Sequence, residues 1–366
     1  TFGRPRILIG KDPRRSGYML ESALSAGIAA SGVDAYMMYV TTTPSVAYIT
    51  RTEDFRFGVM ISASHNPYYD NGIKVLSSTG EKLDEETIER IEDFIDGPED
   101  AVPYAKDDKI GVTKDYSACR ERYAGYLINC PEQRFFNRRV GLDCANGGSY
   151  KLAKHVFEAL GAETHVIHYA PNGLNINVNC GSTHLESLAE FVVNNGLDVG
   201  FAFDCDADRC LAVDEHGNVI NGDQIMYVAA VAMKNKGQLK NNTLVTTIMS
   251  NFGLYKALED EGIAFEKTAV GDKYVWENMR DNGHILGGEQ SGHIIFGDYA
   301  RTGDGILTAL MVMQAMLETD KPLSELVAAC QMYPQVLKNV RVDEKEGTMN
   351  DPVVQAAVQA AGEALG

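Results

Sequence analysis

The stretch Gly58–Lys74, GVMISASHNPYYDNGIK, indicates an α/β fold and places a candidate site within it. Its apolar start, Val59 to Ile61, is typical of a short buried strand. The small and polar residues that follow cannot extend such a strand, so they predict a turn at its carboxyl end. Open α/β sheets bind ligands at that edge. We therefore expect Ser64 and His65, which lie in this turn, to belong to a functional site.

Ser64 is the candidate nucleophile. A serine hydroxyl reacts poorly unless a base removes its proton or the acceptor arrives highly activated. A phosphoryl group offers the second route, because its transfer depends mainly on positioning and charge neutralisation. The alternative is an ordinary strand-to-loop turn, in which Ser and Asn side chains bond their own backbone. The turn alone does not separate these two interpretations.

Composition limits the possible functions. The 366 residues are too many for one core and predict several domains, and 45% hydrophobic residues with 35 glycines are typical of a soluble α/β protein. A net charge of −18 argues against nucleic acid and anionic membranes as partners, and no apolar run is long enough to span a membrane. A small phosphorylated substrate remains compatible. The seven scattered cysteines indicate free thiols in a reducing cytoplasm.

A pattern of strand, polar turn, helix, glycine and strand occurs three times, within residues 6–40, 140–167 and 244–270. This order is typical of right-handed βαβ units. It predicts three similar α/β domains, each with a mixed sheet flanked by helices. The alternative is that βαβ units recur in any α/β protein. The predicted domains are residues 1–115, 116–218 and 219–332, followed at 333–366 by the start of a C-terminal α+β domain.

A second candidate site follows the apolar run Gly200–Phe203, where Asp204, Asp206 and Asp208 alternate along the chain. Alternate residues of an extended segment share one face, so the three carboxylates are expected to converge. Like charges at close range repel unless a cation lies among them. Oxygen ligands in this small number favour Mg²⁺ over Ca²⁺. The alternative is a solvated acidic turn.

Three further polar turns are candidates for substrate binding. Arg14 precedes a predicted helix, where an arginine does not serve helix stability and an anion is a plausible partner. Lys273 lies in the turn GDKYV at the start of another helix. The loop Gly287–His293, GGEQSGH, combines a Glu, a Ser and a His with three glycines, and such groups suit sugar hydroxyls. By contrast, Pro171–Asn177 is predicted to be structural, because Asn and Gly supply turn geometry.

Taken together, SASHNP with NGIK, DCDADR, GDKYV and GGEQSGH resemble the α-D-phosphohexomutase superfamily over essentially the whole chain. Within it, the motif GEQSGHIIF, with TGDG downstream, is most similar to the bacterial phosphoglucosamine mutases, which interconvert glucosamine 6-phosphate and glucosamine 1-phosphate. Phosphoglucomutases and phosphomannomutases, which tend to have Met in the middle of that loop, remain the alternative.

The resemblance implies a role for each matching residue. Ser64 would carry the phosphoryl group, and Mg²⁺ would be bound by Ser64, Asp204, Asp206 and Asp208. Lys74, His293 and His65 would be catalytic, and Glu289, Ser291, Lys273, Arg209 and Arg14 would bind the phosphosugar. The implied reaction passes through a phosphoserine enzyme and a sugar bisphosphate.

Three departures from the superfamily pattern stand out. Cys205 and Ala207 occupy positions where glycines are usual between the aspartates. The superfamily's N-terminal segment, with an active-site arginine, is not in this sequence. Neither is most of the C-terminal phosphate-binding domain, whose start is expected near residues 336–342. A second alternative is therefore a fragment that binds Mg²⁺ and sugar phosphate without turnover. The sequence does not indicate an oligomeric state.

Overall fold

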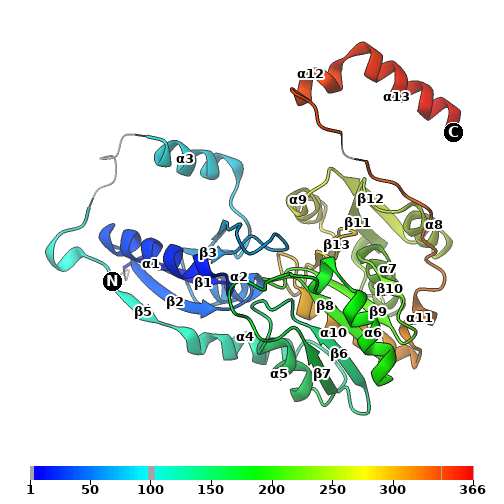
Figure 1. The fold of residues 1–366 in the computed structure, drawn as a ribbon, viewed down its shortest axis with the longest axis horizontal. Coiled ribbons are helices and arrows are strands. Elements are labelled where there is room, and N and C mark those ends of the chain that lie inside the picture. Colours follow the sequence, from blue (N-terminus) through cyan, green and yellow to red (C-terminus); the bar gives the residue numbers. More distant parts are fainter. Residues whose placement is uncertain (1–3, 98–103, 339, 366) are drawn as a thin grey trace. The chain divides into compact units, whose positions relative to one another are not determined.

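The computed structural model describes residues 4–97, 104–338 and 340–365. The chain divides into two compact units, residues 1–332 and residues 333–366. The first unit contains three successive sheets, which appear in blue to cyan, green and olive along the chain in Figure 1. Each sheet is mixed and flanked by helices. The predicted fold class, three similar α/β domains, is therefore confirmed.

The first sheet has the strand order β4-β3-β1-β2-β5. Its strands are β1 (Arg6–Lys11), β2 (Asp34–Val40), β3 (Phe57–Ile61), β4 (Ile73–Ser77) and β5 (Thr113–Asp115), and its helices are α1 (Arg15–Ala30), α2 (Thr43–Thr52) and α3 (Glu85–Ile95). Only β4 runs antiparallel to its neighbour in this sheet. The sequence does not predict β5, because all three of its residues are exposed and no apolar alternation marks it.

The second sheet has the order β10-β9-β8-β6-β7 and is preceded by α4 (Arg120–Ile128). Its elements are β6 (Arg139–Asp143), α5 (Leu152–Ala159), β7 (Glu163–Ile167), α6 (Glu186–Asn195), β8 (Val199–Phe203), β9 (Cys210–Asp214) and β10 (Val219–Ile220). β10 pairs with β9 as the return strand of a hairpin. The domain boundary predicted at 218/219 is therefore wrong by a few residues, because it separates β10 from its own sheet.

The third sheet has the order β12-β11-β13-β14. Its elements are α7 (Gly222–Asn235), β11 (Thr243–Thr247), α8 (Phe252–Asp260), β12 (Ala264–Thr268), α9 (Asp272–Asn282), β13 (Leu286–Gly288), β14 (Ile294–Phe296), α10 (Gly305–Thr319) and α11 (Leu323–Leu326).

The three sheets share one topology. In each, a first strand pairs in parallel with the second and third strands, and the fourth strand is antiparallel to the third. In each of the three α/β domains, a glycine follows the first helix of the repeat. These glycines, Gly32, Gly161 and Gly262, have φ of +82°, +94° and +64°, the left-handed backbone conformation that commonly ends an α-helix. The three-fold repeat predicted from the sequence is therefore confirmed.

The shared topology places the three candidate loops at equivalent positions. The Ser64 turn joins β3 to β4, the aspartate loop joins β8 to β9, and the Glu289 loop joins β13 to β14. Each loop thus connects the third strand of its sheet to the antiparallel fourth strand. The three candidate loops are therefore topologically equivalent.

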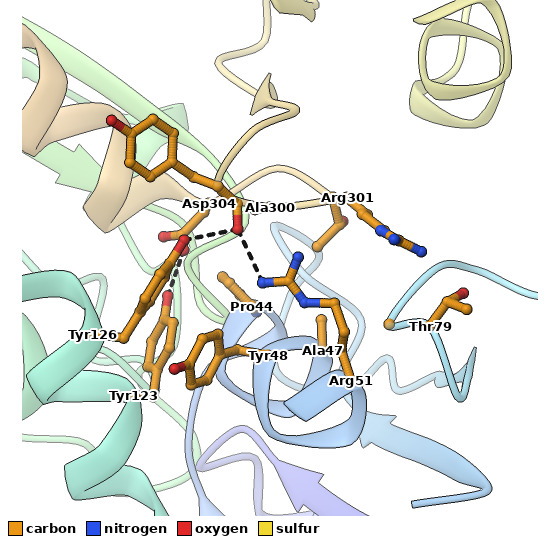
Figure 2. A pocket seen from close by; sticks show the side chains of 13 residues that line it. Pro44, Ala47, Tyr48, Arg51, Thr79, Tyr123, Tyr126, Ala300, Arg301 and Asp304 are labelled. Atoms are coloured by element: carbon orange, nitrogen blue, oxygen red, sulfur yellow. Dashed lines mark hydrogen bonds between the residues drawn. The ribbon is translucent and has the colours of Figure 1, made fainter. Parts of the chain in front are cut away.

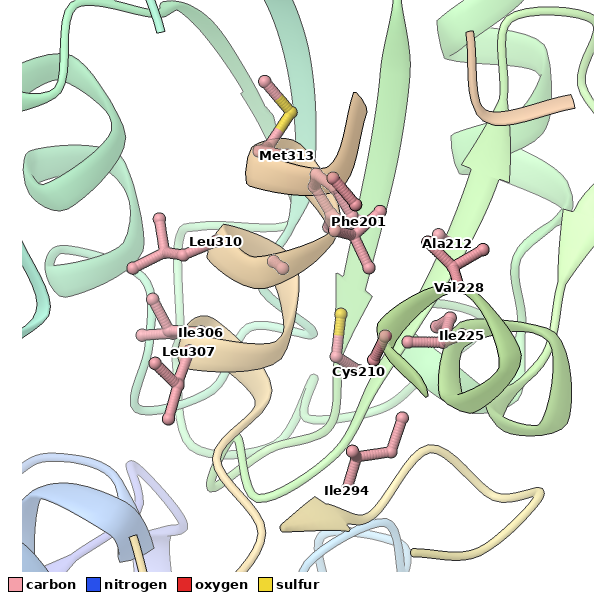
Figure 3. Packing of buried hydrophobic residues seen from close by; sticks show 14 of the residues in the cluster. Phe201, Cys210, Ala212, Ile225, Val228, Ile294, Ile306, Leu307, Leu310 and Met313 are labelled. Atoms are coloured by element: carbon pink, nitrogen blue, oxygen red, sulfur yellow. The ribbon is translucent and has the colours of Figure 1, made fainter. Parts of the chain in front are cut away.

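The second and third sheets share a hydrophobic core, which Figure 3 shows around α10. Most residues of α10 are buried, and the helix contacts β8, β9 and α7. Leu310 and Met313 of α10 belong to the same cluster as Phe201 and Cys210 of the second sheet. A helix that is apolar on nearly all sides must be covered on all sides, and packing between two sheets meets that need.

The second unit contains α12 (Lys345–Asn350) and α13 (Pro352–Leu365). Residues 336–338 and 340–342, where a further domain is expected to begin, have no regular secondary structure. Among the residues described above, no helix has the length and apolar character needed to cross a membrane.

Candidate active site

Ser64 lies in the turn after β3 with a backbone φ of +52°, a conformation that non-glycine residues seldom adopt. Its N–H donates to Ser62 Oγ at 3.0 Å, and Ser62 Oγ donates to the buried Asp12 Oδ2 at 2.6 Å. Unusual backbone conformations of this kind persist where the surroundings hold them, and they concentrate at functional sites. Asp12 and Ser62 were not predicted as site residues.

Arg14 does not face a ligand, and its predicted anion-binding role is wrong. The side chain is fully buried, and Nε donates to Asp12 Oδ2 at 2.8 Å. Nη1 donates to the carbonyls of Pro67 and Asp70, and Nη2 donates to those of Ser64 and Asn66. A guanidinium has five N–H donors, and these five contacts use all of them. Arg14 therefore supports the Ser64 turn.

The aspartate loop meets the Ser64 turn directly. Ser64 Oγ donates to Asp204 Oδ2, and the N–H of Arg209 donates to Asp204 Oδ1 at 3.2 Å. The three aspartates are buried, and one carboxylate oxygen of each lies within 4.8 Å of the others. The structure thus brings together the two strongest candidates from the sequence, which lie 140 residues apart.

Lys74, from β4, completes this cluster. Its Nζ lies 2.7 Å from Asp206 Oδ2 and 2.9 Å from Asp208 Oδ2. Asp206 also accepts a hydrogen bond from Thr43 Oγ1, a contact that the sequence did not predict. Lys74 and Thr43 belong to the first domain, so both reach across to the aspartates of the second.

The pKa directions follow from these contacts. Burial, and then the neighbouring Asp208 and Asp206, raise the pKa of Asp204 well above its ordinary value. Burial alone would raise the pKa of Asp208, but Lys74 and His293 outweigh it and the net direction is downward. Burial would likewise lower the pKa of Lys74, but Asp206 and Asp208 outweigh it and raise that pKa. Lys74 therefore stays protonated.

The residues fit a hard divalent cation. Oδ1 of Asp206 and Oδ1 of Asp208 are buried and accept no hydrogen bond. A buried carboxylate oxygen without a partner is costly, and a cation removes that cost while offsetting the repulsion among the three charges. The donor atoms are all oxygens, which suit Mg²⁺.

Residues of the third domain make different contacts. His293 is buried, and its Nε2 accepts from the N–H of Gly303 at 3.2 Å and lies 3.4 Å from Asp272 Oδ2. Glu289 Oε1 accepts from the N–H of Gly271 at 3.1 Å. Among the described residues, no hydrogen bond joins the His293 or Glu289 side chain to the aspartate cluster formed by Asp204, Asp206 and Asp208.

The remaining predicted residues are placed as follows. Ser291 and His65 are exposed. Lys273 Nζ pairs with Glu85 Oε1 of the first domain at 2.6 Å and lines a cavity of about 190 Å³. Arg209 Nε is buried without a hydrogen-bond partner, which leaves a donor for an anionic ligand. Ser64, Lys74, Asp204, Asp206 and Asp208 form one contact cluster, whereas Glu289, Ser291 and Lys273 lie outside it.

One site residue was assigned only a structural role from the sequence. Asn177, in the loop predicted to be structural, donates through Nδ2 to the carbonyls of Ser64 and Asn66. A contact across 113 residues leaves no local sequence signal.

A small pocket lined by residues of α2 and α4 and of the segment 299–304 includes none of the predicted site residues (Figure 2). Tyr123 of α4 donates to Asp304 Oδ2 at 2.5 Å, and Asp304 Oδ1 caps α10 by accepting from the N–H of Leu307 at 3.0 Å. Burial raises the pKa of Asp304 to about 6, although the hydrogen bonds from Leu307 and Tyr123 act in the opposite direction.

This pKa predicts a pH-dependent stability. An unfolded Asp304 releases its proton near its ordinary pKa of 3.8, whereas the folded protein retains it up to about pH 6. Stability therefore falls as pH rises through this window, by roughly 3 kcal/mol at about 1.4 kcal/mol per pKa unit.

The substitution Asp304→Asn tests this prediction, because it keeps the side-chain oxygen that caps α10 and removes the titrating carboxyl group. Urea unfolding from pH 4 to 7 should show it gaining stability relative to wild type as pH rises. The exposed Asp298 gives the control Asp298→Asn, and parallel profiles for all three proteins would contradict the prediction.

The chain matches three protein domain families. Residues 2–101 match the phosphoglucomutase/phosphomannomutase alpha/beta/alpha domain I, residues 121–217 match domain II and residues 221–333 match domain III. A protein of Lachnospira eligens named phosphoglucosamine mutase is 58% identical over 364 residues, which cover 100% of this chain and 81% of the relative. A protein of the same name from Lachnoclostridium phytofermentans is 55% identical over 363 residues, covering 99% of this chain and 81% of the relative.

A solved structure has the same fold. The crystal structure of a phosphoglucomutase/phosphomannomutase family protein from Burkholderia thailandensis superposes with a TM-score of 0.77 at 22% identity. The match covers 92% of this chain and 72% of that one.

Proposed function

Because this chain belongs to the α-D-phosphohexomutase superfamily, and is therefore a phosphotransferase of the isomerase class, we propose that it interconverts glucosamine 6-phosphate and glucosamine 1-phosphate. The observation that supports the proposal best is the contact between Ser64 Oγ and Asp204, which joins a serine turn of one domain to a buried aspartate cluster of the next. Relatives named phosphoglucosamine mutase support the choice of sugar.

The proposed reaction has two transfers. In the first, the bond between Ser64 Oγ and phosphorus breaks as a free sugar hydroxyl bonds to the phosphorus, and the proton of that hydroxyl passes to Ser64 Oγ, which gives a sugar bisphosphate and a free serine hydroxyl. In the second, after the sugar has turned over, Ser64 Oγ bonds to the phosphorus of the other phosphoryl group as its bond to the sugar oxygen breaks, and the serine proton passes to that oxygen and restores the sugar hydroxyl. The mechanism needs little covalent chemistry from the protein beyond Ser64, so the other residues act by position and charge.

Each residue of the cluster has a proposed task. Ser64, Asp204, Asp206 and Asp208 would hold Mg²⁺, which when bound neutralises charge on the transferred phosphoryl group. Lys74 is protonated and supplies a second positive charge at the same place. Arg209 offers its unpartnered Nε–H to a phosphate oxygen. His293 lies close enough to lower the pKa of Asp208, and we place it at the reacting hydroxyls.

The cysteine residues and the net charge support a cellular location and a class of partner. All seven cysteines are buried free thiols, which supports a reducing cytoplasmic location. A charge of −18 disfavours nucleic acid and anionic membrane, so the proposed partner is a small phosphosugar.

The substrate is tested by comparing kcat/KM for glucosamine 6-phosphate, glucose 6-phosphate and mannose 6-phosphate in the intact protein. A missing hydrogen-bond partner in a buried site costs about 1–3 kcal/mol, which corresponds to a preference of roughly ten- to a hundredfold. Glucosamine 6-phosphate should therefore be preferred by that factor, with the others turned over slowly. A preference for glucose or mannose phosphate would overturn the choice of sugar and leave the mutase assignment standing.

Glu289 is the residue that we propose for the shared sugar hydroxyls. Its Oε1 is held by the N–H of Gly271, which orients the carboxylate in one plane. The site must hold the sugar in two orientations, so this carboxylate should contact hydroxyls common to both. Glu289→Gln should then lower kcat/KM about equally for glucosamine 6-phosphate and glucose 6-phosphate. Glu190→Gln, at an exposed acid on α6, is the control, and a Glu289→Gln enzyme as active as this control would remove Glu289 from the site.

A further inference from the structure

Two backbone carbonyls of the Ser64 turn are each held from two sides. The carbonyls of Ser64 and Asn66 both accept from Arg14 Nη2 at 2.8 Å. The same two carbonyls accept from Asn177 Nδ2, at 2.9 Å for Ser64 and 3.1 Å for Asn66. Arg14 belongs to the same domain as Ser64, whereas Asn177 belongs to the domain that contains the aspartates. Asn177 therefore links the turn of the nucleophile to the domain of the proposed metal ligands.

Asn177 is presented by a loop with fixed ends. Asp143, at the end of β6, is fully buried and accepts from His168 Nδ1 at 2.9 Å and from the N–H of Gly181 at 2.9 Å. These two residues bracket the loop 169–180. Within it, the N–H of Asn177 donates to the carbonyl of Ala145 at 3.1 Å. Asp143, His168 and Cys180 are near enough to hold a metal, but the hydrogen bonds to Asp143 already explain that cluster as the anchor of this loop.

The backbone of Ser64 needs such support. Its φ of +52° is unfavourable for a serine, and relaxation to an extended conformation would turn its carbonyl and move Oγ. Two carbonyls that accept from one amide must converge on it, so the Asn177 contacts oppose that relaxation. Oγ then stays against Asp204.

We propose that Asn177 is a positioning residue for phosphoryl transfer at Ser64. It touches none of the reacting atoms, and it acts by holding the carbonyls of Ser64 and Asn66 in place from the second domain. This inference rests on the proposed function, since it assigns Asn177 a part in that same transfer.

Two substitutions and a matched control test the proposal. Asn177 has a φ of +56°, a conformation that glycine adopts readily, so Asn177→Gly removes the side-chain amide without straining the backbone. Asn177→Asp keeps the size and shape of the side chain but replaces the donating amide nitrogen with a carboxylate oxygen. That oxygen cannot donate to the two carbonyls and repels them. The control is Asn179→Gly, because Asn179 has a φ of +51°, is exposed and lies in the same loop. All three intact proteins are compared with wild type by thermal melting and by kcat and KM for glucosamine 6-phosphate.

A positioning role predicts a fall in kcat of about 10- to 100-fold in Asn177→Gly, the scale of a displacement near 1 Å at a reacting group. KM should change little, because ground-state binding is not affected. Asn177→Asp should be less active than Asn177→Gly, and Asn179→Gly should match wild type in kcat. A purely steric or folding role predicts the reverse order for the first two, because aspartate preserves the packing. Amide hydrogen exchange in a peptide spanning 61–67 should be faster in both Asn177 variants than in the control.

The outcomes separate two failures. A wild type that interconverts no hexose phosphate overturns the proposed function and the role of Asn177 with it. An active wild type with Asn177→Gly as active as Asn179→Gly overturns the positioning role alone. So does an Asn177→Asp enzyme that is as active as wild type, or exchange in the 61–67 peptide that the Asn177 variants leave unchanged.

Discussion

Replacing Ser64 with alanine is expected to reduce mutase turnover roughly 10³- to 10⁵-fold, the scale seen when a group acting directly on a transferred phosphoryl is lost. The hydroxyl is the proposed covalent carrier, and among the described residues no other side-chain hydroxyl is hydrogen-bonded to Asp204. The fold should survive, because alanine meets the same backbone strain as serine at a φ of +52°. The turn also keeps the hydrogen bonds that Arg14 and Asn177 donate to its carbonyls.

The measurement is intact mass before and after incubation with glucose 1,6-bisphosphate, followed by peptide mapping. Wild type should gain one phosphate on the peptide that contains Ser64, and Ser64→Ala should gain none. Ser78→Ala, at an exposed serine beyond β4, is the control and should label as wild type does. A phosphate on Ser62 instead would show that the carrier is misassigned, although Ser62 Oγ is already bonded to Asp12.

Replacing Asp204 with asparagine is expected to reduce turnover about 10³-fold while leaving the metal-free protein as stable as wild type, or more so. The amide can keep both contacts of the carboxylate, because its oxygen accepts from the N–H of Arg209 and its nitrogen donates to Ser64 Oγ. It replaces the carboxyl whose charged form is disfavoured by burial and by Asp208 and Asp206, so it removes a source of repulsion from the cluster. Affinity for Mg²⁺ should fall by more than the 10- to 100-fold typical of residues that only support metal ligands.

Calorimetric titration with Mg²⁺ and thermal melting with and without Mg²⁺ measure these effects. Wild type should melt at a higher temperature in the presence of the ion, because a ligand that binds the folded state stabilises it. Asp204→Asn should lose most of that increase, and Asp298→Asn, which removes an exposed charge, should keep it. If Asp204→Asn binds Mg²⁺ as tightly as wild type, the cation site lies elsewhere. If it melts far below wild type without metal, the aspartates are structural.

The sequence by itself determined the local features of this protein. Val59 to Ile61 and Gly200 to Phe203 form strands that end in polar turns, as their apolar runs predicted. The repeated order of strand, helix and glycine predicted three similar sheets, because helix ends and strand periodicity are set within a few residues. Alternating aspartates after a buried strand converge because extended chain directs alternate residues to one side.

Only the tertiary structure decided which of these features meet. Ser64 contacts Asp204, 140 residues away, where the connection between the third and fourth strands of the first sheet meets the equivalent connection of the second sheet. The position of α10 between two sheets, and of β10 in the second sheet, likewise depends on packing partners remote in sequence. Arg14 shows the limit most clearly. Its charge and its place before a helix are visible in the sequence, but the acceptors that occupy its five donors come from Asp12 and from a turn 50 to 56 residues away. Hydrogen bonds are satisfied in space, so a local pattern reveals a donor without revealing its partner.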